Sequence, residues 1–327
     1  MPVALLQRRL IFVTGKGGVG RSTVAGALGL VAAGRGKRTI VAELTGEHRL
    51  ARAYGHREGR RFEEIELAPG LFTISISPEQ AMEEYLRVKV PGAIGHALGQ
   101  SRLFQAFAMA TPGMRELLGI GKAWELAQPR RRTHGADPYD LVIIDAPATG
   151  HGVGVLRTPR TFSEIARVGP IAHQGETIAR TIADRDFTAI VGVCMPEEMP
   201  VTETLALRQA LLAQRLELDA VVLNARYPSR FTDDELAVLT AALSGCKAPT
   251  HPGRAPMADT PPGSPPLRAA IRAAISEHAR AARHAQQEQR LRGAFDGPLL
   301  TLPFVFAPAI EADQLGLLAA RLDRELR

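Results

Sequence analysis

The chain has 327 residues, 45% hydrophobic and 23% charged, so its apolar content is sufficient for the core of one large domain or of two ordinary ones. The net charge of +6 comes mainly from arginines dispersed along the sequence, which favours a soluble protein over one that binds nucleic acid. Cys194 and Cys246 form no CxxC motif, and no signal peptide or long apolar segment is visible, so we expect a cytoplasmic protein without a cysteine zinc site.

A strand, a glycine-rich turn and a helix follow one another near the start of the chain. Residues 10–14 are an apolar run typical of a parallel strand that is covered on both faces, and helical spacing of apolar residues begins after Ser22. The turn between them directs backbone N–H groups and the positive end of a helix at one point, where phosphate binds. We therefore predict that a nucleotide is held by Gly15, Gly17, Gly18, Val19, Gly20, Arg21, Ser22 and Thr23.

This turn matches two nucleotide-binding motifs. Gly15-x4-Gly20-Arg21-Ser22 fits the nucleoside-triphosphate loop G-x-x-x-x-G-K-[ST], except that arginine replaces the lysine. The same residues fit G-x-G-x-x-G, with Glu43 at about the spacing of an acid that binds ribose. The motif alone therefore leaves both an ATP-binding protein and an NAD(P)-dependent oxidoreductase open.

Two further strands are predicted after the first helix. Residues 38–43 form the second strand, which ends at Glu43, and residues 71–76 alternate as a third. The residues 44–62 between them are polar and are predicted to be a loop.

A helical insertion is predicted after the third strand. Apolar residues recur at helical spacing from residue 78 to about residue 128, with breaks at Pro91 and Pro112. A crossover between parallel strands needs only about a dozen residues, so this region is expected to be an inserted helical subdomain. We expect the basic run 129–132 that follows it to be a solvated loop.

The strand predicted at 139–145 decides between the two motifs. It ends in Asp145, and if it lies beside the first strand, this carboxylate faces the phosphates. There it can hold a water molecule on Mg²⁺ while the Ser22 hydroxyl binds the ion directly. A hydride-transfer enzyme has no use for this pair, so ATP with Mg²⁺ is favoured. His151 follows in the next loop, and a catalytic and a structural role are equally compatible with its position.

The last third of the chain completes a single α/β domain over residues 1–327. Residues 244–266 are rich in proline and glycine and are predicted to be a flexible loop. A polar helix at 266–292, a strand at 299–306 and a helix at 311–327 follow. Because strands alternate with helices, we predict a doubly wound, mostly parallel sheet.

Several segments resemble a known family. GKGGVGRST at 15–23 resembles the deviant phosphate loop of the signature-lysine class, which includes nitrogenase iron protein and arsenite-pump ATPases. DAPATGH at 145–151 is similar to a stretch of the arsenite-pump and tail-anchored-protein-targeting ATPases. The chain is identified as a member of that P-loop family and is most similar to its actinobacterial anion-transporter-like ATPases. Further similar segments are 112–117, 156–159, 195–200, 203–204 and 222–224.

The resemblance implies an ATPase that works as a nucleotide-gated dimer. Lys16 would reach across the dimer to the partner's phosphates, Arg21 and the loop amides would hold phosphates, and Ser22 with Asp145 would hold Mg²⁺. Hydrolysis would then reopen the dimer and change its contact with a client.

The resemblance also implies a base site and a partner. Asn224 would read adenine, and the loop that begins at Pro303 would cover it. The partner would be a second copy or a homologous ATPase, and the client a hydrophobic or anionic species or a membrane component.

The sequence departs from the family pattern at three places. Arg21 replaces the loop lysine, and a planar guanidinium differs in shape from an ammonium, so nucleotide binding is expected to survive better than hydrolysis. The water-positioning segment DPAH appears here as Thr45-Gly46-Glu47-His48, which leaves Glu43 or Glu47 for that role, and the zinc-binding CxxC is absent. These departures keep a second interpretation open, a weakly hydrolytic ATP-binding subunit that pairs with an active homologue.

Overall fold

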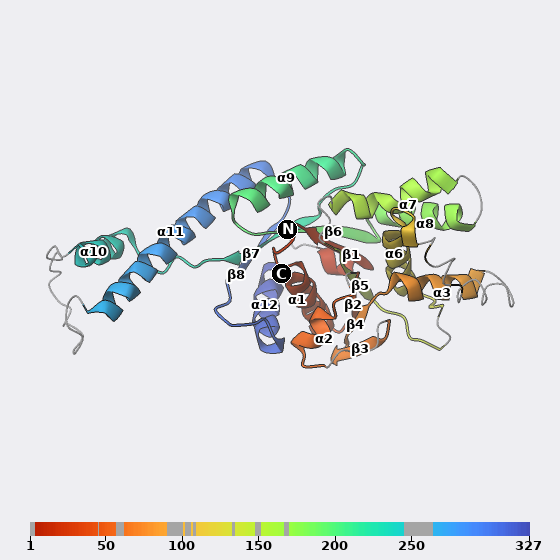
Figure 1. The fold of residues 1–327 in the computed structure, drawn as a ribbon, viewed down its shortest axis with the longest axis horizontal. Helices are drawn as coiled ribbons and strands as arrows, with labels where there is room; N and C mark the ends of the chain where they lie inside the picture. The colour runs from red at the N-terminus through yellow and green to blue at the C-terminus, as the bar shows by residue number, and fades with distance from the viewer. Residues whose placement is uncertain are drawn as a thin grey trace.

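The computed structural model describes residues 4–44, 46–56, 62–89, 101, 106, 109–132, 135–147, 152–166, 170–244 and 264–327. Among these residues no helix combines the length and the apolar character needed to cross a membrane. The described chain forms a layered body from which one helical arm projects (Figure 1).

The centre of the body is a sheet of short apolar strands, as expected where both faces are buried. The strands are β1 (Leu10–Gly15), β2 (Thr39–Glu43), β3 (Glu64–Ala68), β4 (Leu71–Ser75), β5 (Leu141–Asp145), β6 (Thr188–Cys194), β7 (Ala220–Arg226) and β8 (Leu299–Pro303). Their order is β3-β4-β2-β5-β1-β6-β7-β8, and neighbours are parallel except for β3 with β4. This order confirms the predicted doubly wound, mostly parallel α/β fold.

Helices cover both faces of the sheet (Figure 1). They are α1 (Arg21–Gly34), α2 (Arg49–Ala53), α3 (Pro78–Lys89), α6 (Met114–Leu126), α7 (Gly152–Ala166), α8 (Pro170–Ala183), α9 (Glu198–Leu212), α10 (Asp233–Leu243), α11 (Pro265–Ala294) and α12 (Ala312–Glu325). Apolar residues of α1, α2 and α12 pack on one face, and those of α6, α7, α8, α9 and α11 pack on the other.

Each central strand contributes to both of these apolar layers. In β1, Leu10 and Phe12 pack against the layer that contains α6 to α9, whereas Ile11 and Val13 pack against α1 and α12. All four side chains are fully buried, because successive side chains of a strand point to opposite faces. The double burial fixes the sheet in place and so fixes where its carboxyl edge lies.

The region after β2 differs from the sequence prediction. Residues 44–62 were predicted as a polar loop, but they contain α2, and β3 adds an antiparallel edge strand just beyond them. A helix of five residues is too short to be stable by itself. It forms here because the Glu43 carboxylate accepts hydrogen bonds from its first two backbone N–H groups. The last strand also differs, since β8 ends at Pro303 and not at residue 306.

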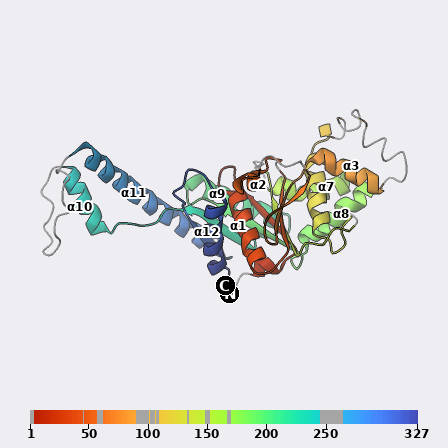
Figure 2. The same cartoon turned by 90° about the horizontal axis from the view of Figure 1, so that it is seen from below.

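The two ends of the sheet carry different helical structures (Figures 1 and 2). Helices α3, α6, α7 and α8 gather at one end, and α3 and α6 lie within the region 78–128 that we interpret as an insertion. The Trp124 indole on α6 donates to the Thr181 hydroxyl on α8 at 3.1 Å, so this side chain holds two helices together. At the other end, α10 and α11 form the arm. Most of the predicted flexible loop, 245–263, lies outside the described residues.

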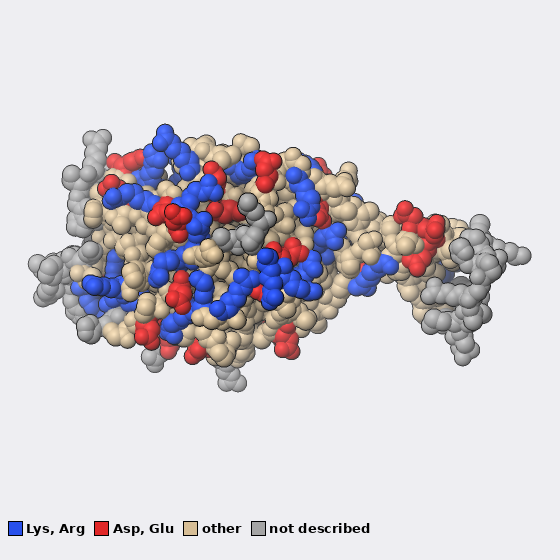
Figure 3. Space-filling view, turned by 180° about the vertical axis from the view of Figure 1, so that it is seen from behind, with Lys and Arg blue, Asp and Glu red and all other residues tan. Residues whose placement is uncertain are grey.

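The charged side chains are spread over the surface. On the face seen in Figure 3, lysine and arginine are interspersed with aspartate and glutamate. Exposed ion pairs such as Arg185 with Glu217 contribute to this mixing. Such pairs keep the surface polar and contribute little to stability.

The basic run 129–132 is a loop, as predicted, but it is solvated only in part, since Pro129 and Arg130 are exposed and the Arg131 side chain is not. The Arg131 side chain is only 1% exposed and forms ion pairs with Glu64 and Glu125. Lys122 joins this cluster with its Nζ 2.8 Å from Glu125, and the Tyr139 hydroxyl donates to Glu64 at 2.6 Å. Burial raises the pKa of Glu125, but Lys122 and Arg131 outweigh it, so the pKa lies below its ordinary value. The positive and negative side chains of this cluster therefore neutralise one another in the part of the protein where α3, α6, α7 and α8 gather.

Removal of the central carboxylate of this cluster should destabilise the fold. We expect Glu125→Ala to lower the free energy of unfolding by about 3 kcal/mol, because Lys122 and Arg131 each lose a buried counter-charge. Urea unfolding at pH 7 measures the change. The matched control is Glu164→Ala on α7, whose ion pair with Arg160 is more than half exposed and should contribute less than about 1 kcal/mol. Equal changes in the two variants would contradict the prediction.

Candidate functional site

The candidate site lies at the carboxyl edge of the sheet, where β1, β2 and β5 end side by side. β5 pairs with β1 and with β2, and the register places Asp145 opposite Val13 on one side and Glu43 on the other. The residues 15–23, called the phosphate loop below, leave β1 at this edge and enter α1. Ligands of open parallel sheets bind at such an edge, where the strand order changes direction.

Ser22 and Asp145 lie together at this edge. The Ser22 hydroxyl donates to the Asp145 carboxylate at 2.5 Å, from the first turn of α1 to the last residue of β5. Burial raises the pKa of Asp145, although the hydrogen bond from Ser22 and the charge of Arg21 act in the opposite direction. A hydroxyl and a carboxylate at this spacing are the hard oxygen ligands that Mg²⁺ takes from a protein when phosphate supplies the rest.

Glycine is required at two positions of the phosphate loop. A Cβ on Gly15 would lie 2.4 Å from the carbonyl oxygen of Val193, and one on Gly20 would lie 2.2 Å from Nδ2 of Asn224. Gly20 also has a φ of +87°, which side chains rarely adopt. The Asn224 amide in turn donates to the Val19 carbonyl at 2.9 Å. β6 and β7 therefore hold the backbone of the loop in shape from one side.

Arg21 is buried beneath this loop. Its guanidinium donates to the Ala146 carbonyl at 2.7 Å, so it reaches the residue that follows β5. Burial lowers the pKa of the Arg21 guanidinium, and the nearby Asp145 carboxylate raises it. The group keeps its charge, since arginine is not deprotonated in proteins. It supplies a fixed positive charge next to the Ser22–Asp145 pair.

Glu43 is the cap of α2. Its carboxylate accepts from the backbone N–H groups of Arg49 at 2.8 Å and Leu50 at 3.0 Å, and the residue is completely buried. Burial raises the pKa of Glu43, and the hydrogen bonds from α2 act against that rise. Both carboxylate oxygens are engaged by α2, so neither is available to the ribose hydroxyls that the G-x-G-x-x-G interpretation requires.

Arg49 is a residue to which the sequence analysis gave no role. It begins α2, forms an ion pair with Glu47, and lines a cavity of about 220 Å³ together with the phosphate loop. This cavity also contacts Ile310 and Leu315 near the start of α12. The spacing of residues in the sequence does not predict that Arg49 lies beside the phosphate loop, because its place depends on the hydrogen bonds by which Glu43 caps α2. The Arg49 side chain is half exposed and is held by its ion pair with Glu47.

Lys16 lies at the rim of the site. Its Nζ is 2.5 Å from the Glu203 carboxylate on α9, and both side chains are more than one third exposed. The lysine therefore has a partner within its own chain. An exposed pair of this kind contributes little energy and is easily exchanged for another partner.

Aromatic side chains gather beyond Asn224 and Pro303, where β7 and β8 end. The Tyr227 and Phe304 rings are stacked with their centroids 4.5 Å apart. Phe306 meets Phe304 edge-on at 4.8 Å and is 55% exposed, which is unusual for so large an apolar side chain. No pattern considered above predicts this cluster. The only local signal is the alternation of Phe304 and Phe306, which we interpreted as part of the last strand.

Parts of the predicted site lie outside the described residues. They include Thr45 of the altered DPAH segment and residues 148–151, which contain His151. Of the remaining predicted residues, the structure brings Arg21, Ser22 and Asp145 together. Glu43 lies next to them but faces α2, and Asn224 contacts the loop at Val19.

The residues at this edge fit a nucleotide with Mg²⁺ better than a metal held by the protein alone. Among the described residues no group of three or more histidine, cysteine, aspartate or glutamate side chains is arranged to hold a metal. Magnesium needs no such cage, because it keeps water and phosphate ligands and takes one or two from the protein. Ser22 and Asp145 meet that requirement.

Comparison with known proteins gives one family. The model of the anion-transporting ATPase family matches residues 8–174 and 165–241. The ATPase BagA of Mycobacterium tuberculosis is 30% identical over 242 residues, which cover 72% of this chain and 70% of BagA. The ATPase GET3 of Kluyveromyces lactis is 26% identical over 66% of this chain and 71% of its own. The ATPase ASNA1 homolog 1 of Paramecium tetraurelia is 24% identical over 71% of this chain and 78% of its own.

The contact between Gly20 and Asn224 can be tested with matched glycine variants. We expect Gly20→Ala to weaken nucleotide binding at least tenfold, because the new Cβ meets the Asn224 amide and displaces the loop. Gly18→Ala is the control, since Gly18 has almost the same φ of +86° but no atom within 4 Å of the added Cβ. Calorimetric titration with Mg-ATP compares the two. If Gly18→Ala binds as weakly as Gly20→Ala, backbone conformation and not the Asn224 contact limits binding.

Proposed function

We propose, because this chain belongs to the anion-transporting ATPase family, that it binds Mg-ATP at the phosphate loop and hydrolyses it. The observation that carries the proposal is the 2.5 Å contact between Ser22 and Asp145. It joins the phosphate loop to the strand end at which P-loop ATPases carry the aspartate that helps to hold Mg²⁺. An NAD(P)-dependent oxidoreductase is not retained, since Glu43 is committed to α2.

Each residue of the proposed site has a separate task. The loop amides and the N-terminus of α1 would hold phosphate oxygens, and the buried Arg21 would neutralise part of their charge. Ser22 would bind Mg²⁺, and Asp145 would orient a water molecule on the ion. Bound Mg²⁺ would neutralise charge on the phosphates, which is its usual contribution to phosphoryl transfer. Asn224 and Pro303 would border the adenine.

We further propose that the chain works as a dimer with a second copy or a homologous ATPase. Support comes from the resemblance of the phosphate loop to the signature-lysine class and from the geometry of Lys16. Lys16 lies at the exposed rim, and its weak pair with Glu203 leaves it able to turn to a facing subunit. Closure of the dimer would then depend on bound nucleotide. The helical region 78–128 would move with this closure and so change its contact with a client.

A second candidate function is supported by Arg21. Its guanidinium already donates to the Ala146 carbonyl, the first residue after the magnesium acid. A guanidinium held at this position would bind phosphate oxygens. It could not easily shift to follow the negative charge that develops on the phosphates during hydrolysis. The chain would in that case be a weakly hydrolytic, ATP-binding subunit that regulates an active homologue.

Phosphate release separates the two candidates. If the chain is itself the enzyme, the wild type turns over ATP, and Asp145→Asn lowers the rate by about 10²-fold or more because the metal site is lost. If it is the weakly hydrolytic subunit, the wild type is inactive and Arg21→Lys restores turnover. Mg-ATP binding by calorimetry accompanies each assay. Absence of Mg-ATP binding by the folded wild type would refute both candidates.

The pair of Lys16 with Glu203 should restrain closure only slightly. We expect Glu203→Gln to raise ATP turnover by no more than about fivefold, since an exposed pair contributes up to about 1 kcal/mol. Lys16→Ala should lower turnover and also abolish the nucleotide-dependent dimer seen by analytical ultracentrifugation. Glu217→Gln, which breaks a more exposed pair with Arg185, is the control and should change neither. A dimer that survives Lys16→Ala would show that this lysine does not act across subunits.

A further inference from the structure

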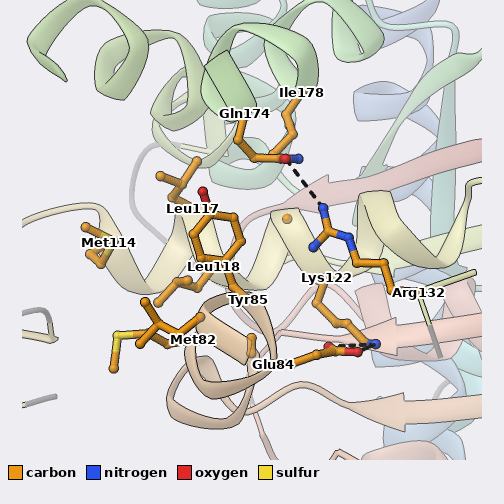
Figure 4. A pocket seen from close by; sticks show the side chains of 13 residues that line it. Met82, Glu84, Tyr85, Met114, Leu117, Leu118, Lys122, Arg132, Gln174 and Ile178 are labelled. Atoms are coloured by element: carbon orange, nitrogen blue, oxygen red, sulfur yellow. Dashed lines mark hydrogen bonds and ion pairs between the residues drawn. The ribbon is translucent and has the colours of Figure 1, made fainter. Parts of the chain in front are cut away.

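A second cavity lies far from the phosphate loop, among α3, α6 and α8 (Figure 4). Its volume is about 100 Å³, and most of its wall is apolar. An apolar cavity of about 150 Å³ can hold benzene, so this smaller space suits a chain of about three carbon atoms rather than a ring or a whole lipid. The apolar wall is formed mainly by Met82, Met114, Leu117, Leu118 and Ile178.

The wall of this cavity contains two hydrogen-bond donors that find no partner in the described part of the chain. They are the Tyr85 hydroxyl and the Gln174 Nε2, and both atoms are buried. Tyr85, Gln174 and Arg132 all line this cavity, and Figure 4 marks the contact between Gln174 and Arg132. Arg132 donates to the Gln174 Oε1 at 3.4 Å, which leaves the amide nitrogen of Gln174 as the free group. Buried donors without partners cost about 1–3 kcal/mol each, so an acceptor placed between them would be stabilised.

The wall of this cavity also carries a positive charge that is not neutralised. Within the described part of the chain, no carboxylate lies within ion-pair distance of the Arg132 guanidinium. Glu84 is the one carboxylate among the residues that line the cavity, and it is held by Lys122 at 2.9 Å. Burial raises the pKa of Tyr85, so its hydroxyl stays protonated and can donate at neutral pH. A carboxylate matches a guanidinium and two further donors.

We propose that this cavity binds a small amphiphilic monocarboxylate, such as a short-chain fatty acid. The carboxylate accepts from Tyr85, Gln174 and Arg132, and the carbon chain lies against Met82 and Leu118. The site is independent of the proposed ATP site, since it shares no residue with the phosphate loop. Binding would add a ligand-sensitive contact between α3, α6 and α8, the helices that gather at one end of the sheet.

The charge and the donors are tested with propionate and the neutral alcohol of the same length, 1-propanol. We expect propionate to bind the full chain in calorimetric titration and to raise its thermal unfolding temperature, and 1-propanol to bind at least tenfold more weakly. Arg132→Gln should weaken propionate binding at least tenfold, and Tyr85→Phe severalfold. The control is Arg180→Gln on the exposed surface of α8, which should have no effect. Equal binding of propionate and 1-propanol, or unchanged binding by Arg132→Gln, would overturn the proposal.

The place of binding is tested by filling the cavity. A Cβ at Gly121 would meet only Ile178, at 3.8 Å, so larger side chains at this position extend into the space. Gly121→Leu should abolish propionate binding, whereas Gly121→Ala, which gains similar helix propensity, should retain most of it. Ser22→Ala should bind propionate normally even where Mg-ATP binding is lost, which separates this proposal from the proposed ATPase function. Propionate binding that persists in folded Gly121→Leu would show that the ligand binds elsewhere.

Discussion

The parallel pairing of β1 with β5 is the constraint on which the candidate site depends. Because the two strands run in the same direction, the phosphate loop and Asp145 leave the sheet at the same edge. The hydroxyl of Ser22 then needs only the first turn of α1 to reach the carboxylate. Neither group would face the other if β5 were antiparallel or one strand further away. The apolar side chains that bury both faces of β1 therefore support the chemistry indirectly.

Three contacts hold the phosphate loop and the neighbouring α2 against the sheet. Asn224 ties the Val19 carbonyl to β7, Arg21 ties α1 to the residue after β5, and Glu43 ties α2 to the sheet. All three contacts are buried or nearly so, and each uses a charged or amide group. In contrast, Lys16 is held only at the exposed rim. The inner part of the site is therefore preorganised, and the residue proposed to act on a second subunit is the one left adjustable.

Much of this arrangement follows from the sequence, and the reasons for the exceptions are physical. Ser22 and Asp145 could be predicted together because strand direction and strand ends determine their place. Glu43 could be located at a strand end, but its function as a cap depends on a five-residue helix that is unstable alone. Arg131 was predicted to be solvated because its neighbours in sequence are basic. Its partner Glu64 is 67 residues away, and Glu125, although only six residues away, reaches it from the end of α6, so no local pattern indicates the pair.

The arm formed by α11 has a mechanical consequence. Its base contacts the strand ends near the site, where His284 packs edge-on against Tyr227 and Glu288 binds Arg226. The helix has 30 residues, which corresponds to a rod roughly 45 Å long. A tilt of about 10° at one end would move the other through about 8 Å, by simple geometry of a rod with that rise per residue. A small rearrangement beside β7 and β8 that tilts α11 would therefore displace the far end of this helix, near Pro265, by several times as much.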